Sequence, residues 1–204
     1  MIVNNEFVKE YIIEMIKLNE DKFHPEDTSV SQVSMPIKRL VKMYPNQDDF
    51  SIGGEINLDY GGGKYDKGTE YLKLWGITNL VYDKYARTPE HNAKVLKILK
   101  KRKVDSITLA NVLCVIPDLN DRLFVVSDAF KYLKINGWML ISVYEGDKSG
   151  NGKIIAKPDR MHWQEHRNTK TYISEIKDAL KPYNIDIIYK NKLIIVKKLG
   201  LNES

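Results

Sequence analysis

The chain has 204 residues, a length that suits one domain with a full hydrophobic core. Hydrophobic residues make up 43% of it, and no apolar run approaches the ~20 residues of a membrane span, so the composition excludes a membrane-spanning class. The formal net charge is +5, which is compatible with a polyanionic partner without requiring one. One cysteine excludes an internal disulfide, and the N-terminus lacks a signal-peptide pattern, so we expect a cytoplasmic protein.

Residues 1–49 are predicted to form an N-terminal helical cap. Apolar residues recur at helical spacing from Phe7 to Ile16, which indicates an amphipathic helix. Residues 22–33 are polar and rich in turn formers. Ser34 followed by Pro36 is typical of a helix start, and this second helix should stop before Pro45.

Residues 50–204 are predicted to form the core, which begins with a strand, a glycine turn, a helix and a second strand. Asp59 closes the first strand and Asp83 follows the second. Three consecutive glycines at 61–63 allow a sharp turn and a close approach of the backbone to a ligand. Asp83 lies about 20 residues farther on, where such folds place a carboxylate on ribose hydroxyls. The pattern therefore predicts a nucleoside-cofactor site; the alternative is a flexible turn with a solvated strand end.

Helices and strands continue to alternate after Asp83. In chain order we predict helix 89–100, strand 104–110, helix 121–134, a turn at 135–137, strand 138–144, helix 171–180 and a hairpin at 185–198. This order predicts an α/β, Rossmann-like three-layer sandwich with a mostly parallel sheet and an antiparallel C-terminal hairpin.

The long polar segment 145–170 shows no predicted element of its own and is interpreted as a lid loop. It contains His162-Trp163-Gln164-Glu165-His166, which satisfies the H-x-x-E-H pattern of some zinc hydrolases. That zinc site requires a helix, because only there do residues i and i+4 share a face. The alternative is a substrate-binding lid, in which Trp163 stacks on a flat acceptor.

The order of these elements carries a family resemblance. The motifs that carry the resemblance are LDYGGG at the end of the first strand, VYD at the end of the second, ANVLCVI at the end of the next, the helix-to-strand passage LKINGWMLISVY and the final hairpin. With these motifs, residues 50–198 resemble the class I S-adenosylmethionine-dependent methyltransferases. More loosely, MPIKRL, VYDKYARTPEHN and YEGDKSGNG resemble small methyltransferase-type proteins of bacteria and their phages, some linked to DNA modification.

The resemblance implies S-adenosylmethionine as the cofactor and assigns residues to it. Asp59 and the glycines Gly61, Gly62 and Gly63 would contact its methionine end, and Asp83 its ribose. Asn111 and Val112 would line the floor beneath the methyl group.

Two departures from the family pattern stand out. Tyr65 holds the place of the third glycine in D-x-G-x-G-x-G, which would tighten the pocket or bend the start of the helix. Only about twenty residues separate Asp83 from Asp105, and one helical crossover takes at least ~10–12 residues. The family's third strand is therefore predicted to be reduced or missing, which leaves open how adenine is held.

The candidate catalytic residues are Asn111, Glu145 and Asp147, where either carboxylate could act as a base or cap a turn. Tyr144, His162, Trp163 and Arg167 are the candidate substrate-binding residues.

The acceptor stays open, with a nucleic acid kept as a candidate. The chain lacks the Asp/Asn-Pro-Pro-aromatic loop of amino-methylating DNA enzymes, and no proline precedes Cys114 as in a cytosine-C5 nucleophile. The alternative functions are a non-catalytic binding module and, more remotely, a zinc hydrolase.

Overall fold

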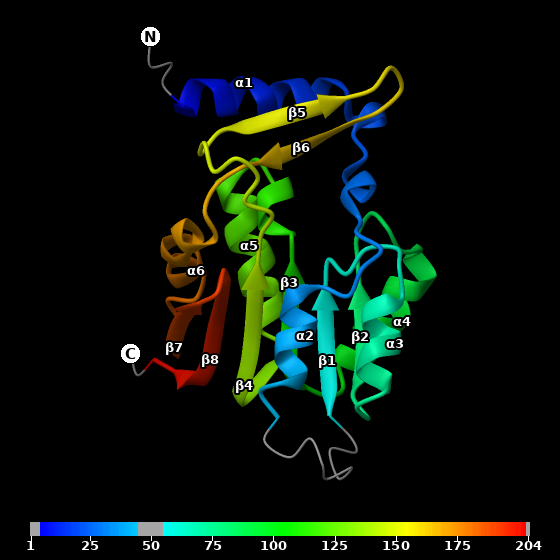
Figure 1. The fold of residues 1–204 in the computed structure, drawn as a ribbon, viewed down its shortest axis with the longest axis vertical. Helices are drawn as coiled ribbons and strands as arrows, with labels where there is room; N and C mark the ends of the chain where they lie inside the picture. The colour runs from blue at the N-terminus through cyan, green and yellow to red at the C-terminus, as the bar shows by residue number, and fades with distance from the viewer. Residues whose placement is uncertain (1–4, 45–54, 203–204) are drawn as a thin grey trace.

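A six-stranded sheet organises the part of the chain that the computed structural model describes, residues 5–44 and 55–202. Its strand order is β2-β1-β3-β4-β8-β7 (Figure 1). The first four strands run parallel, whereas β8 is antiparallel to both of its neighbours. The strands are β1 (Ile56–Tyr60), β2 (Thr78–Tyr82), β3 (Val104–Ala110), β4 (Leu133–Ser142), β7 (Tyr183–Lys190) and β8 (Leu193–Leu201). This sheet confirms the predicted parallel core with an antiparallel terminal hairpin.

β2 forms one edge of the sheet. In the described residues, the chain between β2 and β3 contains one helix, α4 (Pro89–Leu99), and no strand. The predicted loss of the family's third strand is therefore confirmed. The strand order reverses between β1 and β3, which is the switch point where ligands bind in open α/β sheets.

Helices cover both faces of the sheet. The side chains of α4, α5 (Leu119–Phe130) and α6 (Ile173–Ala179) pack in one core cluster, and those of α2 (Met35–Val41) and α3 (Lys67–Lys73) pack in the other. Within β4, Met139 and Ile141 join the first cluster, whereas Leu140 joins the second. Because successive side chains of a strand point to opposite faces, both faces of this strand are apolar. The predicted three-layer sandwich is confirmed.

The N-terminal elements lie at the end of the sheet where the parallel strands finish (Figure 1). They are α1 (Asn5–Leu18) and the short 3-10 helices η1 (Glu20–Lys22) and η2 (Pro25–Thr28). In contrast, α2 packs within the sandwich beside α3. Residues 45–54, which contain the predicted boundary between cap and core and Pro45, lie outside the described residues. None of the helices in the described ranges is long and apolar enough to cross a membrane.

The segment 145–170 corrects the prediction of a lid loop without an element of its own. It contains an antiparallel hairpin of β5 (Gly152–Ala156) and β6 (Met161–Glu165), and β6 packs against η2 at the end of the sheet where the parallel strands finish (Figure 1). The Trp163 ring packs on Gly152 from the opposite strand, where an added Cβ would lie 1.6 Å from the ring. The hairpin depends on this cross-strand contact and on its neighbours, which the polar sequence does not reveal.

The predicted turn at 135–137 also differs. β4 already begins at Leu133, and Asn136 has a φ of 64° within the strand. The pairing of β3 with β4 shifts register between Val104 and Ser106. The turn-forming residues therefore produce an irregularity within a longer strand instead of separating a helix from a strand.

Candidate functional site

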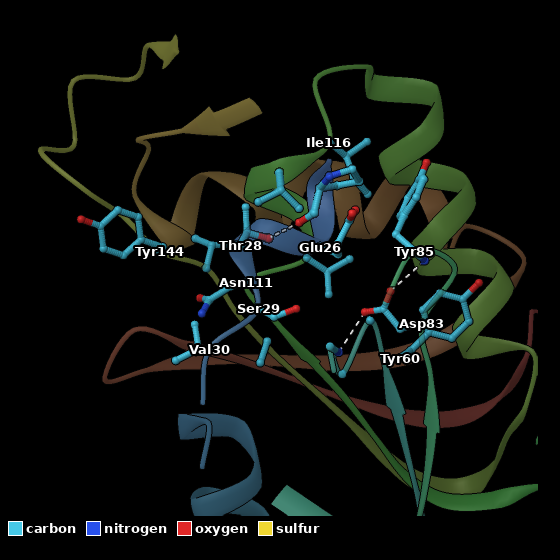
Figure 2. A pocket seen from close by; sticks show the side chains of 18 of the residues that line it. Glu26, Thr28, Ser29, Val30, Tyr60, Asp83, Tyr85, Asn111, Ile116 and Tyr144 are labelled. Carbon is cyan, nitrogen blue, oxygen red and sulfur yellow. Dashed lines mark hydrogen bonds between the residues drawn. The ribbon is translucent and has the colours of Figure 1, made fainter. Parts of the chain in front are cut away.

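A cavity of about 1170 Å³ lies at the switch point of the sheet. Its walls come from the N-terminal residues 13–37, the glycine turn, the loops after β2 and β3, and the end of β4 (Figure 2). Of the residues predicted for the site, those that line it are Asp59, Gly61, Gly62, Gly63, Asp83, Asn111, Val112, Tyr144 and Glu145. The volume is somewhat larger than the usual range for small-molecule sites, so it has room for more than one ligand group.

The glycine turn follows β1 and is held tightly. Gly61 and Gly63 have positive φ values of 77° and 70°, a backbone conformation that glycine adopts without strain. The Gly61 amide donates to the Tyr82 carbonyl at 2.7 Å, which fixes the turn against the end of β2. A Cβ at Gly61 would lie 2.5 Å from a methyl group of Val112. Side chains are therefore excluded where the backbone borders the cavity.

Asp83 stabilises this turn with its carboxylate. One oxygen accepts from the Gly63 amide at 2.8 Å (Figure 2), and the other accepts from the amides of Tyr85 and Ala86 at 3.0 and 2.9 Å. A carboxylate offers about four acceptor positions, and the three amides occupy three of them, so about one position is left. Asp83 thus organises the turn and keeps capacity for one more donor.

Arg87 holds the turn from its outer side. Its guanidinium donates to the Gly63 carbonyl at 2.7 Å and pairs with Asp66 at 2.7 Å. Asp66 immediately precedes α3, so these contacts set where the helix starts. Tyr65, at the family's third glycine position, is 42% exposed and lies on the cavity lining.

Asp59 lies at the end of β1 and is 6% exposed. Burial raises its pKa to about 6, although the hydroxyl of Thr108, which donates to its carboxylate at 2.9 Å, works in the opposite direction. A Cβ at Gly62 would lie 2.7 Å from this carboxylate. The absence of a side chain at Gly62 therefore leaves Asp59 in place beneath the glycine turn.

Asn111 and Val112 form the floor of the cavity at the end of β3. Asn111 adopts a φ of 61°, and its backbone amide donates to the Ser142 carbonyl at 2.8 Å.

Cys114 is fully buried, and burial raises the pKa of its thiol to about 11. The thiol is therefore protonated at neutral pH, which argues against a nucleophilic role for Cys114.

Two of the predicted catalytic carboxylates are already engaged in contacts within the protein. Glu145 lines the cavity, but it accepts from the Thr169 amide at 3.0 Å and pairs with Lys148 at 3.3 Å. Burial opposes ionisation of Glu145, yet these contacts outweigh it and lower its pKa. Asp147 is not on the cavity lining, and hydrogen bonds from Ser149 hold its pKa well below the usual range. Neither carboxylate is placed as a free proton acceptor.

The structure separates Tyr144 from the other predicted substrate residues. Tyr144 lines the cavity and is 55% exposed, with its ring 5.5 Å from that of His166. His162 and Trp163 lie in β6, away from the cavity lining, and Trp163 is only 1% exposed. A buried ring packed on Gly152 does not match the predicted stacking on an acceptor.

The H-x-x-E-H stretch also differs from its zinc-site geometry. Residues 161–165 form a strand, so His162 and His166 do not have the helical spacing on which that interpretation depends. Within the described residues there is no group of three or more His, Cys, Asp or Glu side chains that could hold a metal ion.

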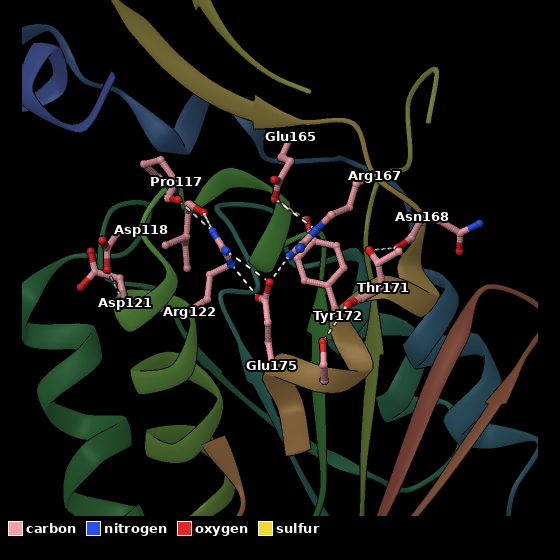
Figure 3. A network of polar contacts seen from close by, with 12 residues as sticks. Pro117, Asp118, Asp121, Arg122, Glu165, Arg167, Asn168, Thr171, Tyr172 and Glu175 are labelled. Atoms are coloured by element: carbon pink, nitrogen blue, oxygen red, sulfur yellow. Dashed lines mark hydrogen bonds and ion pairs between the residues drawn. The ribbon is translucent and has the colours of Figure 1, made fainter. Parts of the chain in front are cut away.

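Arg167 belongs to a buried ion network (Figure 3). It pairs with Glu175 of α6 at 2.6 Å, and its guanidinium lies 3.6 Å from the centre of the Tyr172 ring. Glu175 also binds Arg122 of α5 at 2.8 Å, and Arg122 donates to the Ile116 carbonyl at 2.8 Å. The network connects the end of the hairpin to the loop that forms one cavity wall, so Arg167 has a structural contact in place of the predicted substrate contact.

Sequence reasoning missed the contribution of the N-terminal segment to the site. Glu26, Thr28, Ser29 and Val30 line the cavity (Figure 2). The Ser29 hydroxyl would lie 3.0 Å from a Cβ at Gly63, so this segment touches the glycine turn directly. In the sequence, residues 22–33 are polar and rich in turn formers. That composition does not indicate which part of the fold the segment contacts.

The hairpin and the N-terminal segment hold each other over the site. His24 donates its amide to the Met161 carbonyl at 2.7 Å, next to an isolated bridge between Phe23 and Met161. Arg160 pairs with Asp27 at 3.2 Å. The hairpin therefore supports the segment that closes the cavity.

Comparisons with known proteins agree with this geometry at the level of the fold. No family model and no curated protein matches the chain. Among solved structures, the glycopeptide N-methyltransferase MtfA complexed with sinefungin matches with a TM-score of 0.53 and 10% identity, covering 85% of this chain and 88% of that one. A SAM-dependent methyltransferase from Methanosarcina mazei matches with a TM-score of 0.50 and 14% identity, covering 80% and 98%.

An O-methyltransferase family protein from Burkholderia thailandensis matches with a TM-score of 0.48 and 13% identity over 82% of this chain, which spans 57% of that longer protein. The matches with TM-scores of 0.50 and above agree with the fold of this chain. The chain therefore has the fold of the class I S-adenosylmethionine-dependent methyltransferases.

Proposed function

We propose that this chain binds S-adenosylmethionine in the cavity and transfers its methyl group to an acceptor. The observation that carries the proposal is that the glycine turn, Asp83 and Asn111 meet in one cavity at the switch point of the sheet. Structures of MtfA complexed with S-adenosylmethionine, S-adenosylhomocysteine and sinefungin support the choice of cofactor, because this chain shares their fold.

The residues present fit such a cofactor. Gly61 and Gly62 border the cavity without a side chain, and a Cβ at either position would collide with Val112 or Asp59. The remaining acceptor position of Asp83 can take a ribose hydroxyl, as proposed from the sequence. The Asp59 carboxylate lies 2.7 Å from the Cβ position of Gly62 and lines the cavity, and we assign it to the amino group of the methionine end.

Without a third strand, we assign adenine to an apolar wall. Tyr85 follows Asp83 by two residues and is 54% exposed on the cavity lining. Val112 and Ile116, in the loop after β3, line the same cavity. An aromatic ring and branched aliphatic side chains can enclose a flat base and replace the missing strand.

The cofactor supplies an electrophilic methyl group for an in-line displacement, in which the carbon–sulfur bond breaks as the acceptor lone pair forms the new bond. The role of the chain is to align the donor and acceptor and, where the acceptor is protonated, to accept its proton. Glu26 is the carboxylate that we propose for that proton. It lines the cavity, is 30% exposed in its side chain, and lies 2.8 Å from the His24 imidazole.

A non-catalytic binding module is the second candidate. It is favoured by the engagement of Glu145 with Thr169 and by the position of Asp147 away from the cavity lining. An enzyme and a non-catalytic module would both bind the cofactor, but only the enzyme would transfer its methyl group. The test must therefore measure methyl transfer.

The experiment is transfer of a radiolabelled methyl group from S-adenosylmethionine to single-stranded nucleic acid, peptide and small-molecule pools. For an enzyme we expect labelled product with the wild type, and Glu26→Gln should lower transfer at least ~10-fold while leaving cofactor affinity unchanged. Glu20→Gln is a matched control on the same lining. Tight cofactor binding without transfer to any pool would contradict the enzyme and favour the module.

A further inference from the structure

A second hollow lies on the surface of the sandwich next to the candidate site. It has a volume of about 240 Å³ and lies between α2 and the turn that joins β7 to β8. The accessible wall of this hollow is mainly apolar, and it is bordered by Lys38, Arg39, Lys42 and Lys190, whose exposed cations around the hollow we call the cationic groove. Among the described residues, the others that line this hollow are uncharged.

The four basic residues of the cationic groove lie in or directly after α2 and at the end of β7, and their side chains are exposed. α2 supplies Lys38 and Arg39, and Lys42 caps it. Lys190 pairs with Leu193 across a two-residue turn in which Asn191 and Lys192 have φ values of 53° and 60°. In the part of the chain that the structure describes, none of the four forms an ion pair. Exposed cations of one sign raise the local concentration of anions.

The cationic groove adjoins the cavity of the candidate site. Met35, at the start of α2, lines both hollows. Lys192, in the turn beside Lys190, lines the cavity, and so does Lys148. Lys192 and Lys148 flank Glu145 at 3.6 and 3.3 Å, where they neutralise the acidic group on that side of the cavity. A path of positive charge therefore runs from α2 to the rim of the cavity.

We propose that the cationic groove binds the phosphate backbone of a single-stranded nucleic acid, one unit of which enters the cavity as the methyl acceptor. This inference rests on the proposed function. The cations are exposed and spread over two elements, which fits a chain of hydrated phosphates better than one small anion in a built pocket. A single strand is favoured because a base within a duplex cannot reach into a cavity without leaving the stack.

The test is fluorescence anisotropy of a labelled mixed-sequence single strand of about 16 nucleotides, titrated at several salt concentrations. The groove variant is Lys38→Ala with Arg39→Ala and Lys42→Ala. We expect wild-type affinity to fall steeply with salt. The groove variant should bind at least ~10-fold more weakly, and its log–log salt slope should be smaller by about 2, since each lost phosphate contact on a single strand contributes ~0.7.

A charge-matched control tests whether position matters. Lys100→Ala with Lys101→Ala and Arg102→Ala removes the same charge at the C-terminal end of α4, where all three side chains are exposed. This control should keep wild-type binding and slope. Equal loss in both variants would overturn the proposal, as would a wild type that binds anionic phospholipid vesicles but no oligonucleotide.

Cofactor titration of the same proteins separates the two proposals. The groove variant should bind S-adenosylmethionine as the wild type does, because none of its three substituted residues lines the cavity. Absence of cofactor binding in the wild type would overturn the proposed function. Cofactor binding without oligonucleotide binding would overturn only the assignment of the acceptor.

Discussion

The wall of the cavity formed by β1, the glycine turn and the end of β2 differs from the opposite wall, formed by residues 13–37 and supported by the β5–β6 hairpin. The first is held by contacts between residues about twenty positions apart in the chain, such as the Gly63 amide on Asp83. The second depends on pairs far apart in the chain, such as Asp27 with Arg160. The first wall should therefore determine cofactor binding, and the second should determine closure of the site.

The largest expected effect is on folding, and it tests whether the hairpin is structural. Trp163→Ala should destabilise the protein by about 3–5 kcal/mol, because it empties a buried site packed on Gly152. Urea unfolding monitored by circular dichroism measures the change.

Ile155→Ala in β5 is the control, since this side chain is 42% exposed and should cost far less. A fully stable Trp163→Ala protein that has lost acceptor binding alone would contradict the structural role.

The second prediction tests the first wall. Gly61→Val should weaken S-adenosylmethionine binding at least ~100-fold, or about 2.7 kcal/mol, because the new side chain meets Val112 and the φ of 77° disfavours it. Calorimetric titration measures the affinity. Gly200→Val is the matched control, because no atom lies within 4 Å of its Cβ position. Unchanged affinity in Gly61→Val would remove the glycine turn from the site.

Asp59 provides a third, pH-dependent test. Its pKa is raised to about 6 from 3.8, mainly by burial, so the folded state holds the proton over a range where the unfolded state releases it. Stability contributed by this group is therefore lost as pH rises from about 4 to about 6. Asp59→Asn should remove that loss and stabilise the protein by about 2–3 kcal/mol at pH 7, while weakening cofactor binding.

Urea midpoints of the wild type and Asp59→Asn at pH 4 and pH 7 check this prediction. The variant should gain its advantage only at the higher pH. An equal difference at both values would show that the Asp59 carboxylate carries no raised pKa.

The smallest effect concerns the second wall. Arg160→Ala breaks a partly exposed ion pair with Asp27 and should change the stability of the protein little. It should still speed dissociation of S-adenosylhomocysteine in stopped-flow measurements, since the pair joins the hairpin to the segment above the cavity. Lys181→Ala removes an exposed pair with Asp178 and serves as control. Identical dissociation rates in both variants would contradict a closing role.

The same contrast explains what could be predicted from the sequence. The alternation of elements, the glycine turn at 61–63, the C-terminal hairpin and the missing third strand were predictable, because each depends on local pattern or on the length between Asp83 and Asp105. The β5–β6 hairpin and the roles of Trp163 and Arg167 were not, because contacts with Gly152 and Glu175 create them. The place of Glu26 and Ser29 in the cavity likewise depends on tertiary packing.

The most direct test of the central claim is calorimetric titration of the purified wild-type protein with S-adenosylmethionine, S-adenosylhomocysteine and, as a control, NAD. Our account predicts that the first two bind at micromolar concentrations with one site per chain and that NAD does not. Binding of NAD alone, or of none of the three, would contradict the assignment of the cavity around Gly61, Asp83 and Asn111 to this cofactor.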